Sequence, residues 1–466
     1  MKASNRKTGF QATLVILFSV IFILYNMDIH TDIVLFTNVA LSLWMLHNYL
    51  TSEKKIFLIG GGIALGISIL TKGPFGVFIP IVSSLAYLIA EKRISKISVS
   101  NIIILLLITL TISSLAIIPF FLEKGFKGVW FFLWENNFKR VIGHYGGGST
   151  DYSFYLHNLL YLLLPWSVFL LAGFYFLFKN LIKRKFSSND HFIFWGLFSF
   201  LILISLSKNK LPNYLMSALP FIAIITAQGW NEVFSKGLSK VILFHKGILY
   251  LFISLLFIIP IYFLQEKNLI FWGLVVLAAF VSITFIRFKT KETTLLFNTL
   301  ISMAFIGFFL NVYLFPLLFN LQGAPKAAKV INEKSRPQEK IYYLYPKDIY
   351  LRDSLIAISK STNDDFSEVL TELHFFRNYE FMFYCKKPIM YIEKNQQIEE
   401  IINEGNAWIY TDFEGLDELK KHTQEELNIF PFPNVELNNP MQYMNRKTRE
   451  RSFKKMFLVH LNNDIK

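Results

Sequence analysis

The chain has little of what disulfide-bonded or ordinary soluble proteins rely on. It contains one cysteine, Cys385, in 466 residues, which excludes a small secreted module built on disulfides. Charged residues make up 17% of the sequence and hydrophobic residues 53%, whereas soluble domains average ~25% charged residues. A disordered chain would contain fewer large apolar residues. The composition therefore favours a protein that lies largely in lipid.

Acidic residues are scarce in the hydrophobic part of the chain. Residues 1–321 contain 26 Lys and Arg against 11 Asp and Glu, while residues 322–466 contain 21 against 22. The formal charge of +14 therefore belongs to the hydrophobic part. Its cations form short clusters between apolar runs, not a soluble basic face interleaved with aromatic residues, so the pattern does not indicate a nucleic-acid partner.

Eleven apolar runs come close to the ~20 residues that a transmembrane helix needs. No small-residue cleavage site follows the first run, so we interpret it as a retained span and not as a signal peptide. The third and fourth runs are parted only by residues 71–73 and could be two spans or one re-entrant pair. The sequence predicts a polytopic α-helical membrane domain over residues 1–321, with about eleven spans at 10–26, 32–50, 56–71, 74–90, 101–121, 156–178, 192–206, 212–229, 247–264, 270–286 and 294–320.

Basic residues alternate from loop to loop. One set of loops holds 18 cations against five acids, and the intervening set holds eight against six. Loops rich in Lys and Arg are cytoplasmic. This predicts a multi-pass protein of the cytoplasmic membrane with its amino terminus inside. Eleven spans then place the carboxyl-terminal part outside.

Residues 322–466 look globular. Strand-like stretches at 341–345, 389–392, 407–411 and 456–460 alternate with helical ones such as 396–403 and 415–421. This alternation predicts a small extracytoplasmic α/β domain. It contains no phosphate-binding loop and no metal-spaced His/Cys cluster, so we interpret it as a lid that packs on or shapes a site elsewhere.

Four polar groups on the predicted outer side are hard to explain as topology signals, because charges near apolar runs are costly. They are residues 28–32 (Asp-Ile-His-Thr-Asp), residues 71–74 (Thr-Lys-Gly-Pro), the loop 122–155 and residues 207–214 (Ser-Lys-Asn-Lys-Leu-Pro-Asn-Tyr). Each also has a plain structural interpretation. Asp32 could cap a helix, Lys72 could extend to the interface beside a Gly-Pro turn, and Lys208 and Lys210 could anchor a helix end.

The residue types in these groups suit an anionic lipid-linked substrate. Lysine and arginine bind phosphate, and carboxylates can activate an acceptor hydroxyl as general bases. His144 and His157, with Glu135, could instead ligate a divalent metal, but their spacing is not diagnostic.

At these residues the sequence resembles the family 39 glycosyltransferases of the C-type membrane fold, the group around the protein O-mannosyltransferases and the lipid A aminoarabinose transferases. The matching segments occur in order over nearly all of residues 10–230. They are 31–36 with Thr-Asp at the start of a span, 70–74 with Pro80, Glu135-Asn136 with Arg140, Tyr155 through 164–166, and 207–214 with Leu219-Pro220.

The resemblance implies a membrane glycosyltransferase that transfers a sugar from a polyprenyl-phosphate donor to a lipid, glycan or protein acceptor at the outer face of the membrane. Carried over by position, the donor phosphate would be bound by Lys72, Arg140, Lys210 and Tyr214. Asp32 matches the family's second acidic position, and the other catalytic candidates are Glu135, His144 and His157. No cofactor is implied with certainty.

The chain departs from the family pattern at its start. The family's first two spans, with an Asp-Glu pair in the first outer loop, have no counterpart, so we expect a gene model that starts at an internal Met, a truncated inactive paralogue, or a subunit completed by another chain. A transporter or flippase for a lipid-linked glycan is a further alternative. It would predict internal repeats and polar residues near the bilayer midplane, and neither is evident in the sequence.

Overall fold

The structure, a computed structural model, describes residues 6–26, 31–96, 98–139, 150–264, 268–362, 378–423, 427–435, 443 and 447–462. The chain divides into two compact units. The first comprises Met1–Phe257 and Ile270–Gly307, and the second comprises Ile258–Leu269 and Phe308–Lys466. The boundary at residue 321 stays a prediction.

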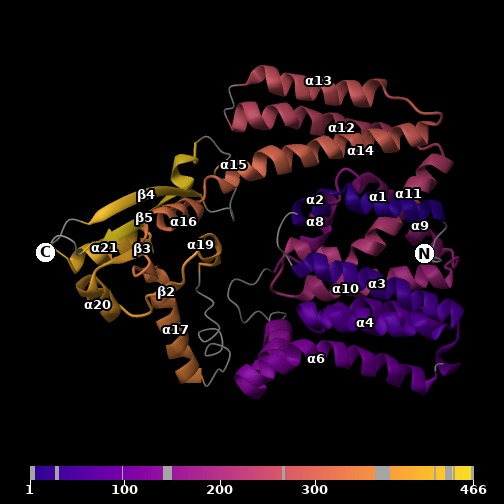
Figure 1. The fold of residues 1–466 in the computed structure, drawn as a ribbon. Coiled ribbons are helices and arrows are strands. Elements are labelled where there is room, and N and C mark those ends of the chain that lie inside the picture. Colours follow the sequence, from indigo (N-terminus) through magenta and orange to yellow (C-terminus); the bar gives the residue numbers. More distant parts are fainter. Residues whose placement is uncertain are drawn as a thin grey trace. The chain divides into compact units, whose positions relative to one another are not determined.

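The described residues of the first unit form helices and the turns that join them (Figure 1). Its helices are α1 (Arg6–Leu17), α2 (Val20–Asn26), α3 (Thr31–Ser52), α4 (Lys55–Lys72), α5 (Phe75–Ala90), η1 (Ile94–Lys96), α6 (Val99–Trp130), η2 (Phe131–Lys139), α8 (Phe154–Leu162), α9 (Ser167–Ile182), α10 (Ser188–Leu206), η3 (Pro212–Ala218), α11 (Leu219–Ser235), α12 (Ser239–Ile258), α13 (Leu269–Phe285) and α14 (Lys291–Phe308).

Each of the eleven predicted apolar runs lies mostly on helix, although the first run and the run at 156–178 are each divided between two helices. Within the part of the chain that the structure describes, six helices are long and apolar enough to cross a membrane, or seven if the bent pair α1 and α2 is one span. Three further apolar helices, α5, α9 and α13, are shorter. A polytopic membrane protein is therefore supported, and the count of eleven spans stays a prediction.

Exposed apolar side chains agree with a lipid environment. On α6, Leu106, Leu107, Leu110 and Leu115 are each more than half exposed. A water-soluble protein would rarely expose such a row, whereas lipid tails are as apolar as leucine.

Glycines set the closest helix contacts. A Cβ atom on Gly229 of α11 would lie 2.1 Å from the main-chain oxygen of Phe169 on α9, and one on Gly66 of α4 would lie 2.5 Å from Ile112 Cβ on α6. Small residues let helix backbones approach closely, which is how helices in membranes gain packing energy. The core around α9, α10 and α11 includes Trp166 and Leu197 among its buried side chains.

The second unit contains a five-stranded sheet with strand order β2-β1-β3-β5-β4. The strands are β1 (Lys340–Leu344), β2 (Ile389–Tyr391), β3 (Ala407–Thr411), β4 (Asn428–Val435) and β5 (Phe453–Leu461). β1 is parallel to β2 and β3, while β5 is antiparallel to β3 and β4. The helical elements of this unit are η4 (Ile259–Phe263), η5 (Phe309–Leu314), α15 (Phe315–Phe319), α16 (Gly323–Lys334), α17 (Pro346–Thr362), α19 (Tyr379–Tyr384), α20 (Gln396–Glu404), α21 (Phe413–Lys421) and η6 (Glu450–Ser452).

The four predicted strands are confirmed, and β4 was missed. Pro431 and Pro433 lie in β4, and proline demotes a stretch in sequence-based assignment because it cannot donate a main-chain hydrogen bond. Among the described strands, β4 lies at the edge of the sheet beside β5, and proline is tolerated in edge strands.

Candidate functional site

Asp32 and Lys72 form a partly buried ion pair where two helices meet. Asp32 lies in the first turn of α3 and is 1% exposed, and Lys72 is the last residue of α4. Because α3 and α4 are consecutive and antiparallel, the start of one and the end of the other lie at the same end of the bundle. Lys72 Nζ lies 2.6 Å from Asp32 Oδ1, with the Lys72 side chain 26% exposed.

The turn before α11 contributes two more groups. Asn213 Nδ2 donates to Asp32 Oδ2 at 2.7 Å. Lys72 Nζ lies 4.7 Å from the centre of the Tyr214 ring, within the range of a cation–π contact. Both residues belong to η3, which begins at Pro212, where the fixed φ of proline suits the first turn of a helix.

A cavity of about 290 Å³ lies beside the ion pair, and its lining includes Asp32, Lys72, Tyr214, Ser207 and Asn137. This volume is close to the lower end of small-molecule sites. It is enough for a phosphate and part of a sugar.

Gly73 brings the segment η2 against the end of α4. Gly73 has a φ of 72°, a left-handed conformation that favours glycine. A Cβ atom there would lie 2.5 Å from Asn137 Nδ2, and Asn137 is in turn bound to the main-chain oxygen of Phe132 at 2.7 Å. The Thr-Lys-Gly-Pro turn is therefore shaped to receive η2.

Two other predicted residues are described but lie apart from the lining of this cavity. Lys210 Nζ donates to the main-chain oxygen of Ser207 at 2.5 Å and lies 5.6 Å from the Tyr152 ring centre. The His157 side chain is 55% exposed, with Nδ1 3.8 Å from Asp151 Oδ2. The hydrogen bond from the Ser153 hydroxyl holds the pKa of Asp151 below its usual range.

Arg140 and His144 lie outside the described residues, and Glu135 lies on η2 without a described side chain. Within the described part of the chain, no group of three His, Cys, Asp or Glu residues is placed to hold a metal ion. The roles assigned to all eight predicted site residues stay predictions.

Sequence reasoning missed Asn213 and Asn137. Asn213 stands between Pro212 and Tyr214 in the fourth polar group, and Asn137 follows the Glu-Asn pair of the long loop. Asn213 is recognised as a site residue because its buried side chain lies beside the buried Asp32 carboxylate. The sequence alone does not show this, because it does not show that the start of α3 meets η3.

The amino-terminal part of the chain is similar to a known protein family. Residues 2–120, which include Asp32 and Lys72, match the profile described as dolichyl-phosphate-mannose-protein mannosyltransferase. Two undecaprenyl phosphate-alpha-4-amino-4-deoxy-L-arabinose arabinosyl transferases of Pseudomonas fluorescens, numbered 1 and 2, are 25% and 28% identical over 229 and 194 residues. These matches cover 49% and 41% of this chain and 40% and 32% of those proteins.

Solved structures share the fold. The crystal structure of ArnT from Cupriavidus metallidurans bound to undecaprenyl phosphate gives a TM-score of 0.65 at 13% identity, covering 98% of this chain and 79% of that chain. The resemblance to the family 39 glycosyltransferases is confirmed. This chain spans less than half the length of the first family 39 relatives that it matches, and at 13% identity the likeness to ArnT shows the fold alone.

Proposed function

We propose that this chain is a membrane glycosyltransferase that moves a sugar from a polyprenyl-phosphate donor to an acceptor hydroxyl. The observation that carries the proposal is Lys72, which ends an apolar helix on a cavity with Tyr214 beneath its ammonium group and Asp32 beside it. A cation at the end of an apolar helix suits a phosphate whose lipid tail remains in the bilayer. The names of the relatives support undecaprenyl phosphate as the lipid and an amino sugar as the transferred group.

The transfer needs an acceptor hydroxyl, a group that takes its proton and a cation that stabilises the leaving phosphate. The acceptor oxygen forms a bond to the anomeric carbon of the sugar, while the bond from that carbon to the phosphate oxygen breaks and polyprenyl phosphate leaves. The acceptor proton passes to a carboxylate or histidine. Lys72 stabilises the negative charge that grows on the leaving phosphate, since a fixed cation acts more strongly in a site of low dielectric constant.

Asp32 is proposed as the residue that positions Lys72. Its oxygens already accept from Lys72 Nζ and Asn213 Nδ2, which favours a role in holding the lysine over a role in taking the acceptor proton. The base is then sought among Glu135, His144 and His157. Arg140 and Lys210 complete the proposed phosphate-binding set.

The charge pattern of the loops indicates the side of the membrane on which the reaction takes place. We propose transfer at the outer face of the cytoplasmic membrane, with the amino terminus inside and the small α/β domain of residues 322–466 outside. Addition of a lipid, glycan or protein acceptor in separate assays identifies the acceptor class, and chelation shows whether the transfer needs a divalent metal.

The test compares two lysines of one helix. Lys55 and Lys72 are the first and last residues of α4, so Lys55→Ala is a matched control for Lys72→Ala. We expect Lys72→Ala to lower the affinity for undecaprenyl phosphate-linked sugar by tenfold or more, about 1.4 kcal/mol, and Lys55→Ala to leave it unchanged.

Two results would refute the proposal. One is unchanged donor affinity in Lys72→Ala protein that still inserts into the membrane. The other is a purified chain in vesicles that carries intact donor across the bilayer without forming a glycosylated product, which would identify a transporter.

A further inference from the structure

A second cavity in the helical unit is lined by five cations. It lies between the end of α11 and helices α12, α13 and α14, and has a volume of about 850 Å³. The cations are Lys240, Lys246, Arg287, Lys289 and Lys291. No Asp or Glu is among the described residues that line it.

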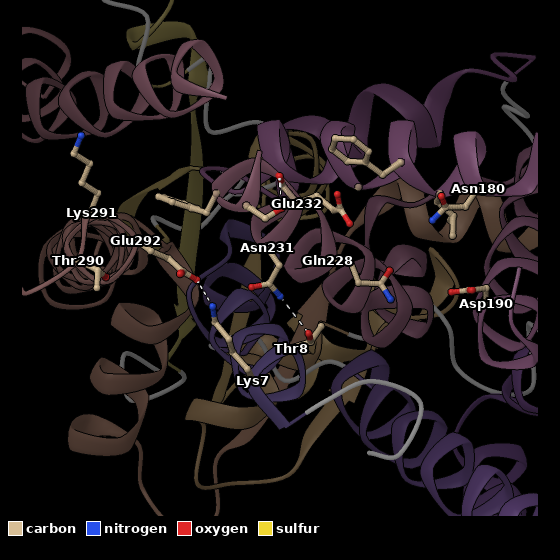
Figure 2. A pocket seen from close by; sticks show the side chains of 16 residues that line it. Lys7, Thr8, Asn180, Asp190, Gln228, Asn231, Glu232, Thr290, Lys291 and Glu292 are labelled. Carbon is tan, nitrogen blue, oxygen red and sulfur yellow. Dashed lines mark hydrogen bonds and ion pairs between the residues drawn. The ribbon is translucent and has the colours of Figure 1, made fainter. Parts of the chain in front are cut away.

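In a neighbouring cavity of this unit, by contrast, a lysine forms an ion pair with a carboxylate. There Lys7 Nζ lies 2.7 Å from Glu292 Oε1, and Asn231 Nδ2 donates to Thr8 Oγ1 at 3.2 Å. Figure 2 shows Lys291 pointing away from the pair of Lys7 and Glu292. Among the described residues, no ion pair joins any of the five cations of the second cavity to a carboxylate.

The remainder of the lining combines aliphatic side chains with a few polar ones, and one buried polar atom there has no hydrogen-bond partner. Ile242, Leu249 and Leu295 contribute aliphatic surface beside the cations. Asn298 is 5% exposed and donates through Nδ2 to the main-chain oxygen of Ile283 at 2.8 Å. Its buried Oδ1 has no hydrogen-bond partner, and a buried acceptor without a donor is costly unless a ligand supplies one.

This cavity lies at the opposite end of the bundle from Asp32. Helix α11 begins directly after Ser217 and Ala218, next to the first cavity, and its last turn reaches the second cavity at Phe234. Its 17 residues extend about 25 Å at ~1.5 Å per residue, close to the thickness of the hydrocarbon core. The two cavities therefore lie near opposite ends of α11, about the thickness of a hydrocarbon core apart.

We propose that the second cavity binds the headgroup of an anionic phospholipid that carries free hydroxyls, of the phosphatidylglycerol class. Cations between membrane helices on the basic side are suited to anionic headgroups. The phosphate meets the five cations, the acyl chains continue along the aliphatic surface, and a glycerol hydroxyl donates to Asn298 Oδ1. This site is independent of the sugar-transfer proposal.

The experiment measures lipid binding to the full-length chain in detergent by native mass spectrometry. The test variant combines Arg287→Gln, Lys289→Gln and Lys291→Gln. The matched control combines Lys183→Gln, Arg184→Gln and Lys185→Gln, which removes the same charge from another predicted cytoplasmic loop. We expect the test variant to bind phosphatidylglycerol at least about tenfold more weakly, since each cation near a headgroup contributes ~1 kcal/mol, and the control to stay within about twofold of the parent.

Lipid-side controls separate the sources of the anion. Phosphatidylcholine and inorganic phosphate should not compete, and phosphatidylmethanol, which has the charge but no hydroxyl, should bind about fivefold more weakly, as expected for one lost hydrogen bond. An equal loss in both triple variants would overturn the site in favour of diffuse charge attraction. Competition by inorganic phosphate would replace the lipid with a free anion, and equal binding of phosphatidylmethanol would remove Asn298 from the site.

Discussion

The two partners of the ion pair between Asp32 and Lys72 differ in burial, so replacing one has a different consequence from replacing the other. Taking two charges out of water is expensive, and removing only one partner of a buried pair leaves the other charge uncompensated, at a cost of about 3–5 kcal/mol. The Asp32 carboxylate is almost fully buried, while Lys72 keeps a quarter of its side chain exposed. Replacement of the aspartate therefore leaves a cation that water can still reach, and it is the gentler change.

Substitutions of Asp32 distinguish a positioning role from a catalytic one. In Asp32→Asn the amide oxygen can still accept from Lys72 Nζ, so we expect donor affinity within about threefold of the parent. Asp32→Leu has similar volume but no acceptor, and it should weaken donor binding by about tenfold, equivalent to one lost charge-assisted hydrogen bond. Isothermal titration with the donor lipid and steady-state kinetics measure both quantities.

A different pattern would overturn the positioning role. Removal of a general base typically lowers kcat by 10²–10⁴, by the usual size of proton-transfer catalysis. If Asp32→Asn keeps donor affinity but loses kcat by about a hundredfold or more, Asp32 takes the acceptor proton.

At this scale the sequence predicted part of the site. Helix parity placed the segments that contain Asp32, Lys72 and Tyr214 on one side of the membrane, and the family resemblance then implied a shared site for them. They did not separate these residues from Lys210 and His157, whose side chains turn to Ser207 and Asp151. Rotamers and hydrogen bonds depend on tertiary contacts that residue spacing does not contain.

Among the helices, the contact between α9 and α11 depends on glycine. We expect Gly229→Ala to lower the thermal stability of the detergent-solubilised chain, because the new Cβ would overlap the backbone of α9 near Phe169, and overpacking of this kind costs about 1–3 kcal/mol. Gly247→Ala on α12 is the matched control, since nothing lies within 4 Å of its Cβ position. It should be neutral or stabilising by up to about 1 kcal/mol. Equal melting of the two variants would contradict the close approach.

Hydropathy located the apolar runs but did not show where a helix is interrupted within a run. Hydropathy identifies such runs because a helix that faces lipid needs apolar side chains along its length. The run at 156–178 is divided at residues 163–166, which include Pro165, and the first run bends by 55° between α1 and α2. Hydropathy averages over such breaks and reports length of apolar sequence, not length of continuous helix.

For the whole molecule, the charge pattern predicts opposite sides for two loops. We expect a cysteine introduced as Asp151→Cys in a Cys385→Ser background to react with a membrane-impermeant maleimide in intact cells. Lys289→Cys should react only after permeabilisation, because loops rich in Lys and Arg remain cytoplasmic. Labelling of both, or of neither, before permeabilisation would contradict the predicted topology.

In the second unit, two acidic residues with raised pKa values lie just after the ends of two parallel strands. β1 ends at Leu344 and β3 at Thr411, and each strand is followed by an acidic residue, Asp348 or Asp412. Burial, and then the nearby Asp412 carboxylate, raise the pKa of Asp348 to about 6. Burial also raises the pKa of Asp412, although its side chain accepts from Gly415 N at 2.9 Å.

The sign of the effect follows from proton binding. The folded state holds a proton on Asp348 between about pH 4 and pH 6, where the unfolded state has lost it. The free energy of unfolding therefore falls as the pH rises through this window. After allowance for solvent screening of a half-exposed group, the loss at pH 7 is about 1 kcal/mol.

Asp348→Asn should recover that loss. We expect slower hydrogen exchange in β1 and β3 at pH 7 in the full-length variant than in the parent, and a smaller difference at pH 4.5, where the parent carboxyl is protonated. Asp353→Asn, an exposed change on the same helix α17, is the control and should match the parent at both pH values. Because each comparison is made at a single pH, the intrinsic pH dependence of exchange cancels. Equal protection of Asp348→Asn and parent at pH 7 would show that the paired carboxyls do not limit the stability of this sheet.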